Sequence, residues 1–192
     1  SAVELASLES KTGAEVVRTT NKNSGNLYAE LLLRTLGKKF GAEAPDDDKR
    51  VNAVRSDDRA GVSVIKKWLG EEGIIQGESM IHDGSGLSRL NYVSPELMAR
   101  LLVAAQQMPA GQAFKDSLSA VGVDGTAGGR LKNYTGRIFV KTGSITYVNS
   151  LAGYIKSENE DIAFVVFCND QTRKTDATAV IDKIAAAMAE RK

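Results

Sequence analysis

The sequence has little of the two residues that most often build metal and nucleophile sites. It contains one cysteine, Cys168, and one histidine, His82. A single cysteine excludes a disulfide within the chain, and its position in the apolar run IAFVVFC indicates a buried strand thiol. A single histidine excludes a metal site built from several histidines, and a Ser-His-Asp triad would depend on His82 alone. We therefore expect no metal site, and no sequence feature indicates a cofactor.

A charge imbalance and long apolar runs are also absent. The chain has 25 Lys and Arg against 24 Asp and Glu, so its net charge of +1 provides no attraction to nucleic acid or acidic lipid. It contains no run of about 18 apolar residues and no charged-then-apolar leader, so these residues predict neither a membrane span nor an export signal. At 42% hydrophobic and 26% charged, the 192-residue chain has a globular composition, and we expect a single domain over residues 1–192.

The first forty residues have the apolar spacing of helices. A loose apolar stripe predicts a first helix over residues 1–22, with a break near Gly13. A polar cluster then precedes a second helix, whose expected inward residues are Leu27, Leu31, Leu32, Leu36 and Phe40. We expect Asn23 or Ser24 to be its N-cap, because either side chain can accept a backbone N–H that the helix leaves unpaired.

More helices follow in the middle of the chain. Ser56 is expected to start a helix whose buried face contains Val62, Ile65, Trp68 and Leu69. Ser94 and Pro95 are expected to begin another, and residues 111–120 a short one. Before Ser94, the segment IHDGSGLSR (residues 81–89) is a turn-rich loop. Its glycines suggest a phosphate cradle only weakly, because no phosphate-binding spacing is present.

The apolar pattern changes to a period of two in the last third of the chain. Strands are predicted at 137–145, 148–156 and 161–169, and they should form an antiparallel meander. A final helix starting at Thr172 or Thr175, with Val180, Ile181, Ile184, Ala185 and Met188 inward, should cover one sheet face. The expected fold class is therefore α+β, with an antiparallel sheet of about three strands flanked by helices.

Two copies of Lys-Thr-Gly are present. The copy at Lys141-Thr142-Gly143 ends a predicted strand at the edge of a sheet, which is a suitable place for a site. The copy at residues 11–13 lies in a helix or loop with no strand beside it. We therefore expect only the later copy to belong to a site.

The later copy belongs to a larger motif set. Ser24-Gly25-Asn26 before a helix, together with the late Lys-Thr-Gly strand, resembles the penicillin-binding protein and serine β-lactamase superfamily, whose motifs are Ser-x-x-Lys, Ser-Asp-Asn and Lys-Thr-Gly. The blocks NKNSGNLYAELLLRTLG, DGSGLSRLNYVSPELMARLL, GVDGTAGGRL and VKTGSITYVNSLAGYI are similar to the D-alanyl-D-alanine carboxypeptidase/endopeptidase family, the class C low-molecular-mass penicillin-binding proteins. They cover most of residues 20–170 and imply a partial β-lactamase/transpeptidase-like fold.

The chain departs from the family pattern at two points. Gly25 stands where an aspartate or asparagine is common, and no Ser-x-x-Lys occurs in the 23 residues before Ser24. Ser63-Val64-Ile65-Lys66 has the right spelling, but it follows the Ser-x-Asn motif and its helix needs Ile65 for packing. The resemblance thus implies the C-terminal portion of the domain, without its nucleophile. Strand 161–169 should then be a sheet edge that is exposed, or covered by self-association or by an N-terminal part.

The resemblance implies a catalytic role for three residues. Ser24 would relay a proton toward the leaving amine, because a hydroxyl both donates and accepts. Asn26 would hold the substrate backbone carbonyl. Lys141 would provide the positive charge opposite the terminal carboxylate of the peptide.

Three neighbouring residues are implied to bind substrate. Thr142 would donate to the same carboxylate, and Gly143 would let an extended peptide approach the strand edge. The backbone N–H of Ser144 would be one arm of the oxyanion hole, the other coming from the absent nucleophile.

The function implied is a serine-type D-Ala-D-Ala carboxypeptidase/endopeptidase. It would act on peptidoglycan stem peptides through an acyl-serine intermediate, bind β-lactams, and be periplasmic or otherwise exported in bacteria. The isolated chain would be inactive. The alternative is a non-catalytic module that binds peptidoglycan peptides or a partner; an unrelated Ser-His-Asp hydrolase would need His82 beside a serine.

Overall fold

The computed structural model describes residues 6–43, 56–74, 79–158, 160–172 and 176–190. Its α-helices are α1 (Gly13–Asn23), α2 (Asn26–Phe40), α3 (Asp57–Glu71), α4 (Pro95–Gln107), α5 (Gly111–Ser117) and α6 (Ala177–Glu190). Its strands are β1 (Ser119–Ala120), β2 (Ile138–Ile145), β3 (Val148–Ile155) and β4 (Ile162–Asn169). Short 3₁₀ turns lie at Gly41–Glu43, Gly125–Ala127 and Lys132–Tyr134.

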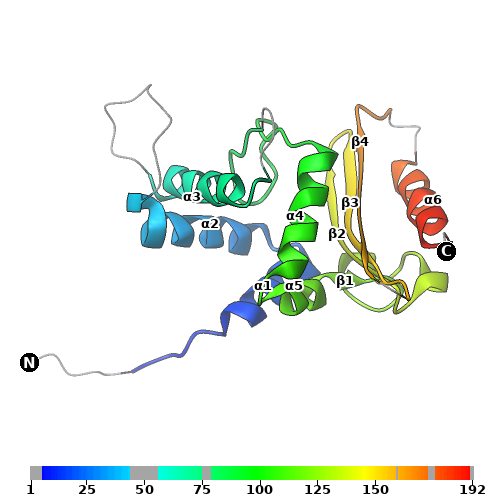
Figure 1. The fold of residues 1–192 in the computed structure, drawn as a ribbon, viewed down its shortest axis with the longest axis horizontal. Helices are drawn as coiled ribbons and strands as arrows, with labels where there is room; N and C mark the ends of the chain where they lie inside the picture. Colours follow the sequence, from blue (N-terminus) through cyan, green and yellow to red (C-terminus); the bar gives the residue numbers. More distant parts are fainter. Residues whose placement is uncertain (1–5, 44–55, 75–78, 159, 173–175, 191–192) are drawn as a thin grey trace, which may run out of the picture.

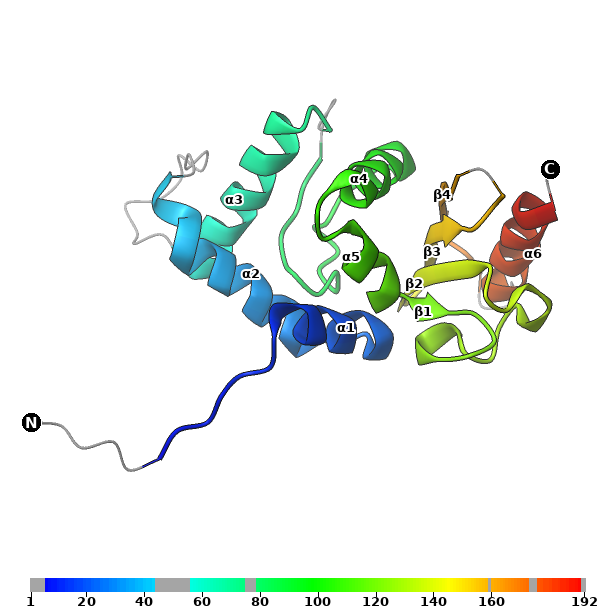
Figure 2. The same cartoon turned by 60° about the horizontal axis from the view of Figure 1, so that its bottom comes forward.

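The strands form one antiparallel sheet in the order β1-β2-β3-β4. Helix α6 covers one face of it, α4 and α5 lie on the other, and α1, α2 and α3 lie beyond them (Figure 1). Figure 2 shows α1 beside α5, on the side away from α6. The predicted α+β class is confirmed, and the described residues hold one strand more than the three expected. Two-residue β1 was missed because so short a strand carries no periodic signal.

Alternation along β2 and β3 divides the core between the two faces of the sheet. Ile138 and Val140 are fully buried in the cluster that includes Ile181 and Ala185 of α6. The intervening Phe139 packs instead against the cluster of Leu102, Leu118 and Tyr154, on the side of α4 and α5. The alternation predicted from the sequence therefore places one apolar row under each helical layer.

The strand predictions are confirmed to within one residue. In the described part of the chain β4 pairs only with β3, so it lies at the sheet edge, as expected for residues 161–169. Cys168 lies on β4 and packs against the α6 cluster, as expected for a strand thiol, but it is only partly buried rather than buried.

The prediction of a first helix over residues 1–22 is wrong in its start. Residues 6–12 have no regular structure, and α1 begins at Gly13. The Thr12 side chain accepts the backbone N–H of Glu15 at 3.3 Å, while the Glu15 carboxylate accepts the backbone N–H of Thr12 at 2.9 Å. This reciprocal capping box makes the expected break a helix start. The earlier Lys-Thr-Gly thus caps a helix and lies on no strand.

The inward faces of α2 and α3 also differ from the prediction. In α2 the buried residues are Leu33 and Gly37, while Leu27, Leu31 and Phe40 are exposed. A Cβ at Gly37 would lie 1.8 Å from the backbone oxygen of Asp57, so the close crossing of the two helices requires glycine. Leucine spacing pointed to the wrong stripe because the crossing is made by the smallest residue.

Helix α3 begins after Ser56, as predicted, but buries Ala60, Gly61 and Leu69; Ile65 and Trp68 are only partly buried, beside Leu69. Helix α4 follows Ser94 and Pro95, as predicted, and buries Leu97 and Leu102.

The last helix starts later than predicted. It begins at Ala177, where the Asp176 carboxylate accepts the backbone N–H of Ala179 at 3.0 Å, rather than at Thr172. Thr175 lies outside the described residues. Ile181 and Ala185 face the sheet as expected, whereas Val180 and Ile184 are exposed, because α6 also buries Ala177 and Ala189 on that stripe.

Tyr154 ties the sheet to α4. Its ring is fully buried, and its hydroxyl donates to the backbone oxygen of Leu102 at 2.7 Å. Burial raises the pKa of Tyr154 to about 12, and the nearby Asp161 charge adds to the rise. Because the folded pKa is raised, this group stabilises the fold fully below the unfolded pKa near 10, and that contribution is lost as the pH rises toward 12.

Tyr154→Phe is expected to lower the free energy of unfolding at pH 7 by about 1 kcal/mol, the net worth of one hydrogen bond. The variant should also lose less stability than the parent chain between pH 10 and pH 12. Urea unfolding at a series of pH values measures both effects, and Tyr147→Phe, which changes an exposed hydroxyl, is the matched control. Equal losses for Tyr154→Phe and the parent over that pH range would contradict the assignment.

Candidate active site

The site is built around the free part of the β2 edge. The backbone oxygen of Arg137 accepts from Lys156 on the β3 side at 2.7 Å, while that of Ile138 accepts from Val121 on the β1 side at 3.2 Å. In an antiparallel pair this direction alternates, so the backbone groups of Thr142 and Ser144 point away from β3. Strand β1 pairs only with Phe139 and Val140, so the edge from Lys141 onward lies beyond the reach of β1.

Ser24 approaches this edge from the junction of α1 and α2. It ends α1 in the left-handed conformation, with φ of 52°, and the next residue, Gly25, is the N-cap of α2. The expectation of Asn23 or Ser24 as N-cap is therefore wrong, because the left-handed residue closes one helix and the second begins only after it. A left-handed serine is uncommon, and here it lies with its hydroxyl against β2.

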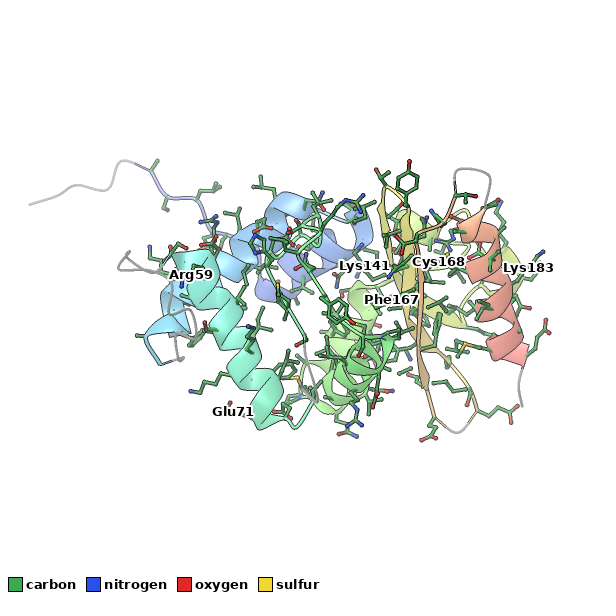
Figure 3. The ribbon with its side chains drawn as sticks, turned by 90° about the horizontal axis from the view of Figure 1, so that it is seen from above. Arg59, Glu71, Lys141, Phe167, Cys168 and Lys183 are labelled. Carbon is green, nitrogen blue, oxygen red and sulfur yellow. The ribbon has the colours of Figure 1, made fainter. Side chains whose placement is uncertain are left out.

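Lys141 joins the two layers. Its Nζ donates to Ser24 Oγ at 2.8 Å and to the backbone oxygen of Thr142 at 2.6 Å. Since that oxygen points outward, the ammonium group lies over the open strand edge, and Figure 3 shows Lys141 between the helices and the sheet. Burial lowers the pKa of Lys141. The cation is therefore incompletely hydrated and suited to an anionic ligand.

Thr142, Gly143 and Ser144 continue the edge. The Thr142 hydroxyl donates to the hydroxyl of Thr126 at 2.7 Å. A Cβ at Gly143 would lie 2.3 Å from Ser150 Oγ on β3, so glycine keeps this part of the strand free of a side chain. Ser144 is exposed. A pocket of about 180 Å³ opens here, lined by Thr126, Arg130, Thr142, Ser144, Asn149 and Thr178 among others.

Asn26 lies close in sequence but makes no such contact. It is the first residue of α2 and is exposed. Within the part of the chain that the structure describes, no hydrogen bond joins its side chain to Ser24 or Lys141. The structure thus brings Ser24, Lys141 and Thr142 together. It leaves Asn26 exposed at the start of α2, where its side-chain amide can bind a ligand.

One contributor was not singled out from the sequence. Thr126 lies in the 3₁₀ turn Gly125–Ala127, in a segment interpreted only as a glycine-rich loop. The turn is held by Lys22 of α1, whose Nζ contacts both carboxylate oxygens of Asp124 at 2.8 and 2.6 Å. An Asp-Gly-Thr triplet was the available signal, but neither the ion pair nor the contact to Thr142 is visible without the fold.

The loop IHDGSGLSR borders the β2–β3 turn, because Arg89 donates to the backbone oxygen of Thr146 at 2.9 Å. Four of its backbone N–H groups are bound by carboxylates: Glu30 accepts those of Gly84 and Ser85, and Asp83 accepts those of Gly86 and Ser88. Burial opposes ionisation of Asp83, but these hydrogen bonds and one from Asn91 lower its pKa overall. Donors already bound to carboxylates cannot cradle a phosphate, so that interpretation is wrong.

The other candidate motifs lie elsewhere. Ser63 is on α3, where its hydroxyl donates to the backbone oxygen of Arg59 at 3.2 Å, and α3 packs on α2 at the end of the molecule opposite α6 (Figures 1 and 2). His82 is exposed in the loop. The described residues contain no cluster of His, Cys, Asp and Glu suited to a metal ion. None of the described helices is long and apolar enough to cross a membrane.

Comparison with known proteins gives a consistent result. The family model described as D-Ala-D-Ala carboxypeptidase 3 (S13) matches residues 1–191. The D-alanyl-D-alanine carboxypeptidase DacB of Haemophilus influenzae is 31% identical over 174 residues, covering 86% of this chain and 33% of that protein. The D-alanyl-D-alanine carboxypeptidase of Actinomadura sp. (strain R39) is 28% identical over 193 residues, covering 97% of this chain and 34% of that protein.

A solved structure agrees with the sequence comparisons. The crystal structure of penicillin binding protein 4 (dacB) from Haemophilus influenzae superposes with a TM-score of 0.76 at 26% identity, covering 92% of this chain and 40% of that one. The chain spans about a third of the length of the curated relatives it matches. With a family model matching nearly every residue and the same fold in a solved relative, this chain belongs to the D-Ala-D-Ala carboxypeptidase 3 (S13) family.

Proposed function

We propose that this site belongs to a serine-type D-Ala-D-Ala carboxypeptidase/endopeptidase that acts on peptidoglycan stem peptides. The observation that carries the proposal is the hydrogen bond from Lys141 Nζ to Ser24 Oγ at 2.8 Å, beside an open strand edge. It joins the two motifs of the family that are present in this chain.

Substrate binding follows from the edge geometry. An extended peptide can pair with the outward backbone groups of Thr142 and Ser144, as in strand addition to an exposed sheet edge. Its terminal carboxylate then lies within reach of the Lys141 ammonium and the Thr142 hydroxyl, which both donate. The outward N–H of Ser144 is one donor to the carbonyl oxygen that becomes an oxyanion. Gly143 keeps the approach clear.

Ser24 and Asn26 act on the other side of the bound peptide. The Ser24 hydroxyl accepts from Lys141 and retains its own proton, so it can pass a proton to the leaving amine and take one in return. The exposed amide of Asn26 can hold the substrate backbone carbonyl. Both residues stand at the junction of α1 and α2, on the helical side of Lys141.

The nucleophile must come from outside these 192 residues. The chemistry requires a serine activated by a neighbouring base, and the Ser-x-x-Lys at Ser63 is on a helix far from the site. We propose that the chain alone forms no acyl-enzyme, and that the complete protein is exported to the bacterial cell envelope, where its substrate lies. β-Lactams, with their carboxylate and reactive amide, would occupy the same edge.

The edge of β4 is the second surface for which we propose a partner. Residues 162–168 include no charged residue and no proline, which are the usual protections of an exposed edge. A further strand, from an N-terminal part of the protein or from a second copy, should pair with it. The residues 1–192 would then be one portion of a larger domain.

The alternative is a module that binds peptidoglycan peptides or a partner without catalysis. The absence of Ser-x-x-Lys near Ser24 favours it for the isolated chain. The two functions share the carboxylate site and differ in whether a covalent intermediate forms once the rest of the domain is present.

Incubation with a fluorescent penicillin is expected to leave the 192-residue chain unlabelled, because Ser24, the serine beside Lys141, accepts a hydrogen bond from the ammonium group and, among the described residues, has no base to take its proton. The full-length DacB of Haemophilus influenzae, incubated in parallel, is the positive control. Gel fluorescence and intact-mass spectrometry measure the adduct. A stable adduct on any serine of this chain would overturn the proposed absence of the nucleophile.

N-acetyl-D-Ala-D-Ala is expected to bind the chain at least about 10-fold more tightly than its C-terminal amide, because a charge-assisted hydrogen bond is worth roughly 1.5–3 kcal/mol. NMR shift titration measures both affinities. Lys141→Met should remove most of the preference, while Lys132→Met, which removes an exposed lysine, should retain it. An unchanged preference in Lys141→Met would rule out Lys141 as the counter-ion.

The preference should also depend on pH. Carboxylate binding needs the protonated ammonium, and burial lowers the pKa of Lys141 from its ordinary value. The affinity for the free acid should therefore fall as the pH rises through that lowered value, and Lys141→Met should remove the fall. An affinity that does not change up to about pH 10.4, the ordinary pKa of a lysine side chain, would contradict this assignment.

A further inference from the structure

Three hydroxyl groups from separate elements form a file that ends at the carboxylate site. Ser119 of β1 is fully buried, and its Oγ accepts the backbone N–H of Thr126 at 3.2 Å. Ser119 Oγ and Thr126 Oγ1 lie 3.4 Å apart, and Thr126 Oγ1 and Thr142 Oγ1 lie 2.7 Å apart. The file thus runs from the core to the open edge of β2.

The buried end of the file constrains which way the protons point. Ser119 Oγ accepts from a backbone N–H, which cannot itself accept, so the Ser119 proton is left to be donated. Among the described residues, Thr126 Oγ1 is the acceptor in hydrogen-bond range of it. If Ser119 donates to Thr126, Thr126 can donate to Thr142, and Thr142 is left with its proton directed into the pocket. Hydrogen bonds in such a file polarise one another and strengthen the last donor.

The turn that carries Thr126 is anchored at several points. The Asp124 carboxylate binds Lys22 and also accepts the backbone N–H of Ala120 at 2.9 Å. Gly125 has φ of 61°, and a Cβ there would lie 2.3 Å from Ser119 Oγ and 2.9 Å from the backbone oxygen of Lys22. An ion pair, a hydrogen bond and close backbone packing therefore place the Thr126 hydroxyl against Thr142.

We infer that Thr126 is a positioning residue that makes the site select a free carboxylate, an inference that rests on the proposed function. Without a ligand, Thr142 donates to Thr126. When a carboxylate arrives, the Thr142 hydroxyl rotates to donate to the carboxylate and the Thr126 hydroxyl rotates to donate to Thr142, while Ser119 donates to Thr126 throughout. A C-terminal amide carries an NH₂ group in place of one carboxylate oxygen. Where that NH₂ group faces the Thr142 hydroxyl, two donors meet and no hydrogen bond forms. The file thereby adds to the discrimination that the Lys141 charge provides.

The test compares Thr126→Val, which keeps the shape but removes the hydroxyl, with Thr126→Ser, which restores it. Affinities of the 192-residue chain for N-acetyl-D-Ala-D-Ala and for its amide are measured by NMR titration. Thr126→Val is expected to lower the acid-to-amide affinity ratio by about 5-fold, the effect of one hydrogen bond of about 1 kcal/mol. Thr126→Ser should recover the ratio. Thr35→Val, which changes an exposed threonine of α2 that does not line the pocket, is the matched control and should not change the ratio.

A role confined to holding the turn would give a different result. Thr126→Val would then lower the free energy of unfolding, or weaken the binding of acid and amide equally. In both cases the acid-to-amide affinity ratio would stay unchanged, and an unchanged ratio would overturn the inference. The acid preference of the parent chain separates this failure from a failure of the proposed function. A parent chain that does not prefer the acid would refute the proposed function, whereas a clear preference that is unaffected by Thr126→Val would refute only the role of Thr126.

Discussion

The Lys141 ammonium is the group on which the site depends, because it must bind two layers of the structure at once. It donates to a hydroxyl at the junction of α1 and α2 and to a backbone oxygen on the outer edge of β2. A partly buried cation is costly unless it has partners, and here one partner comes from each layer. The helical layer must therefore be held in a fixed position against the sheet.

Contacts outside the site provide that fixed position. Asn21 of α1 donates to Ser117 of α5 at 2.7 Å, and Lys22 binds Asp124 in the turn after β1. These residues precede Ser24 by a single helical turn, so they determine where the left-handed serine stands. Fixing α1 against α5 and the Asp124 turn also brings Thr126 to Thr142, and one set of anchors thus positions both sides of the proposed carboxylate site.

The open edge of β2 depends on how briefly β1 pairs with it. Strand β1 starts only at Ser119, opposite Val140, because the chain up to Ser117 is still in α5. A longer β1 would cover the backbone groups of Thr142 and Ser144. The tight connection between β2 and β3 determines which residues face outward, because the alternation of hydrogen bonds runs along the whole hairpin.

Local patterns in the sequence predicted the elements well where one residue type determines the outcome. Period-two alternation located β2, β3 and β4, and serine caps located the starts of α3 and α4. The same reasoning failed for the buried face of α2, because the helix crossing depends on Gly37 and not on leucine spacing. It also missed β1 and the N-cap role of Gly25, which depend on partners distant in the sequence.

The sequence by itself determined the chemistry of the site: a cation, hydroxyls and a glycine in the Ser-x-Asn and Lys-Thr-Gly motifs, and no metal-binding set in its single cysteine and histidine. Only the tertiary structure decided which of these groups meet. It placed Lys141 against Ser24, 117 residues away, left Asn26 at the rim, and added Thr126. The physical reason is that residue type sets what a group can donate or accept, whereas packing between distant segments sets where its partner lies.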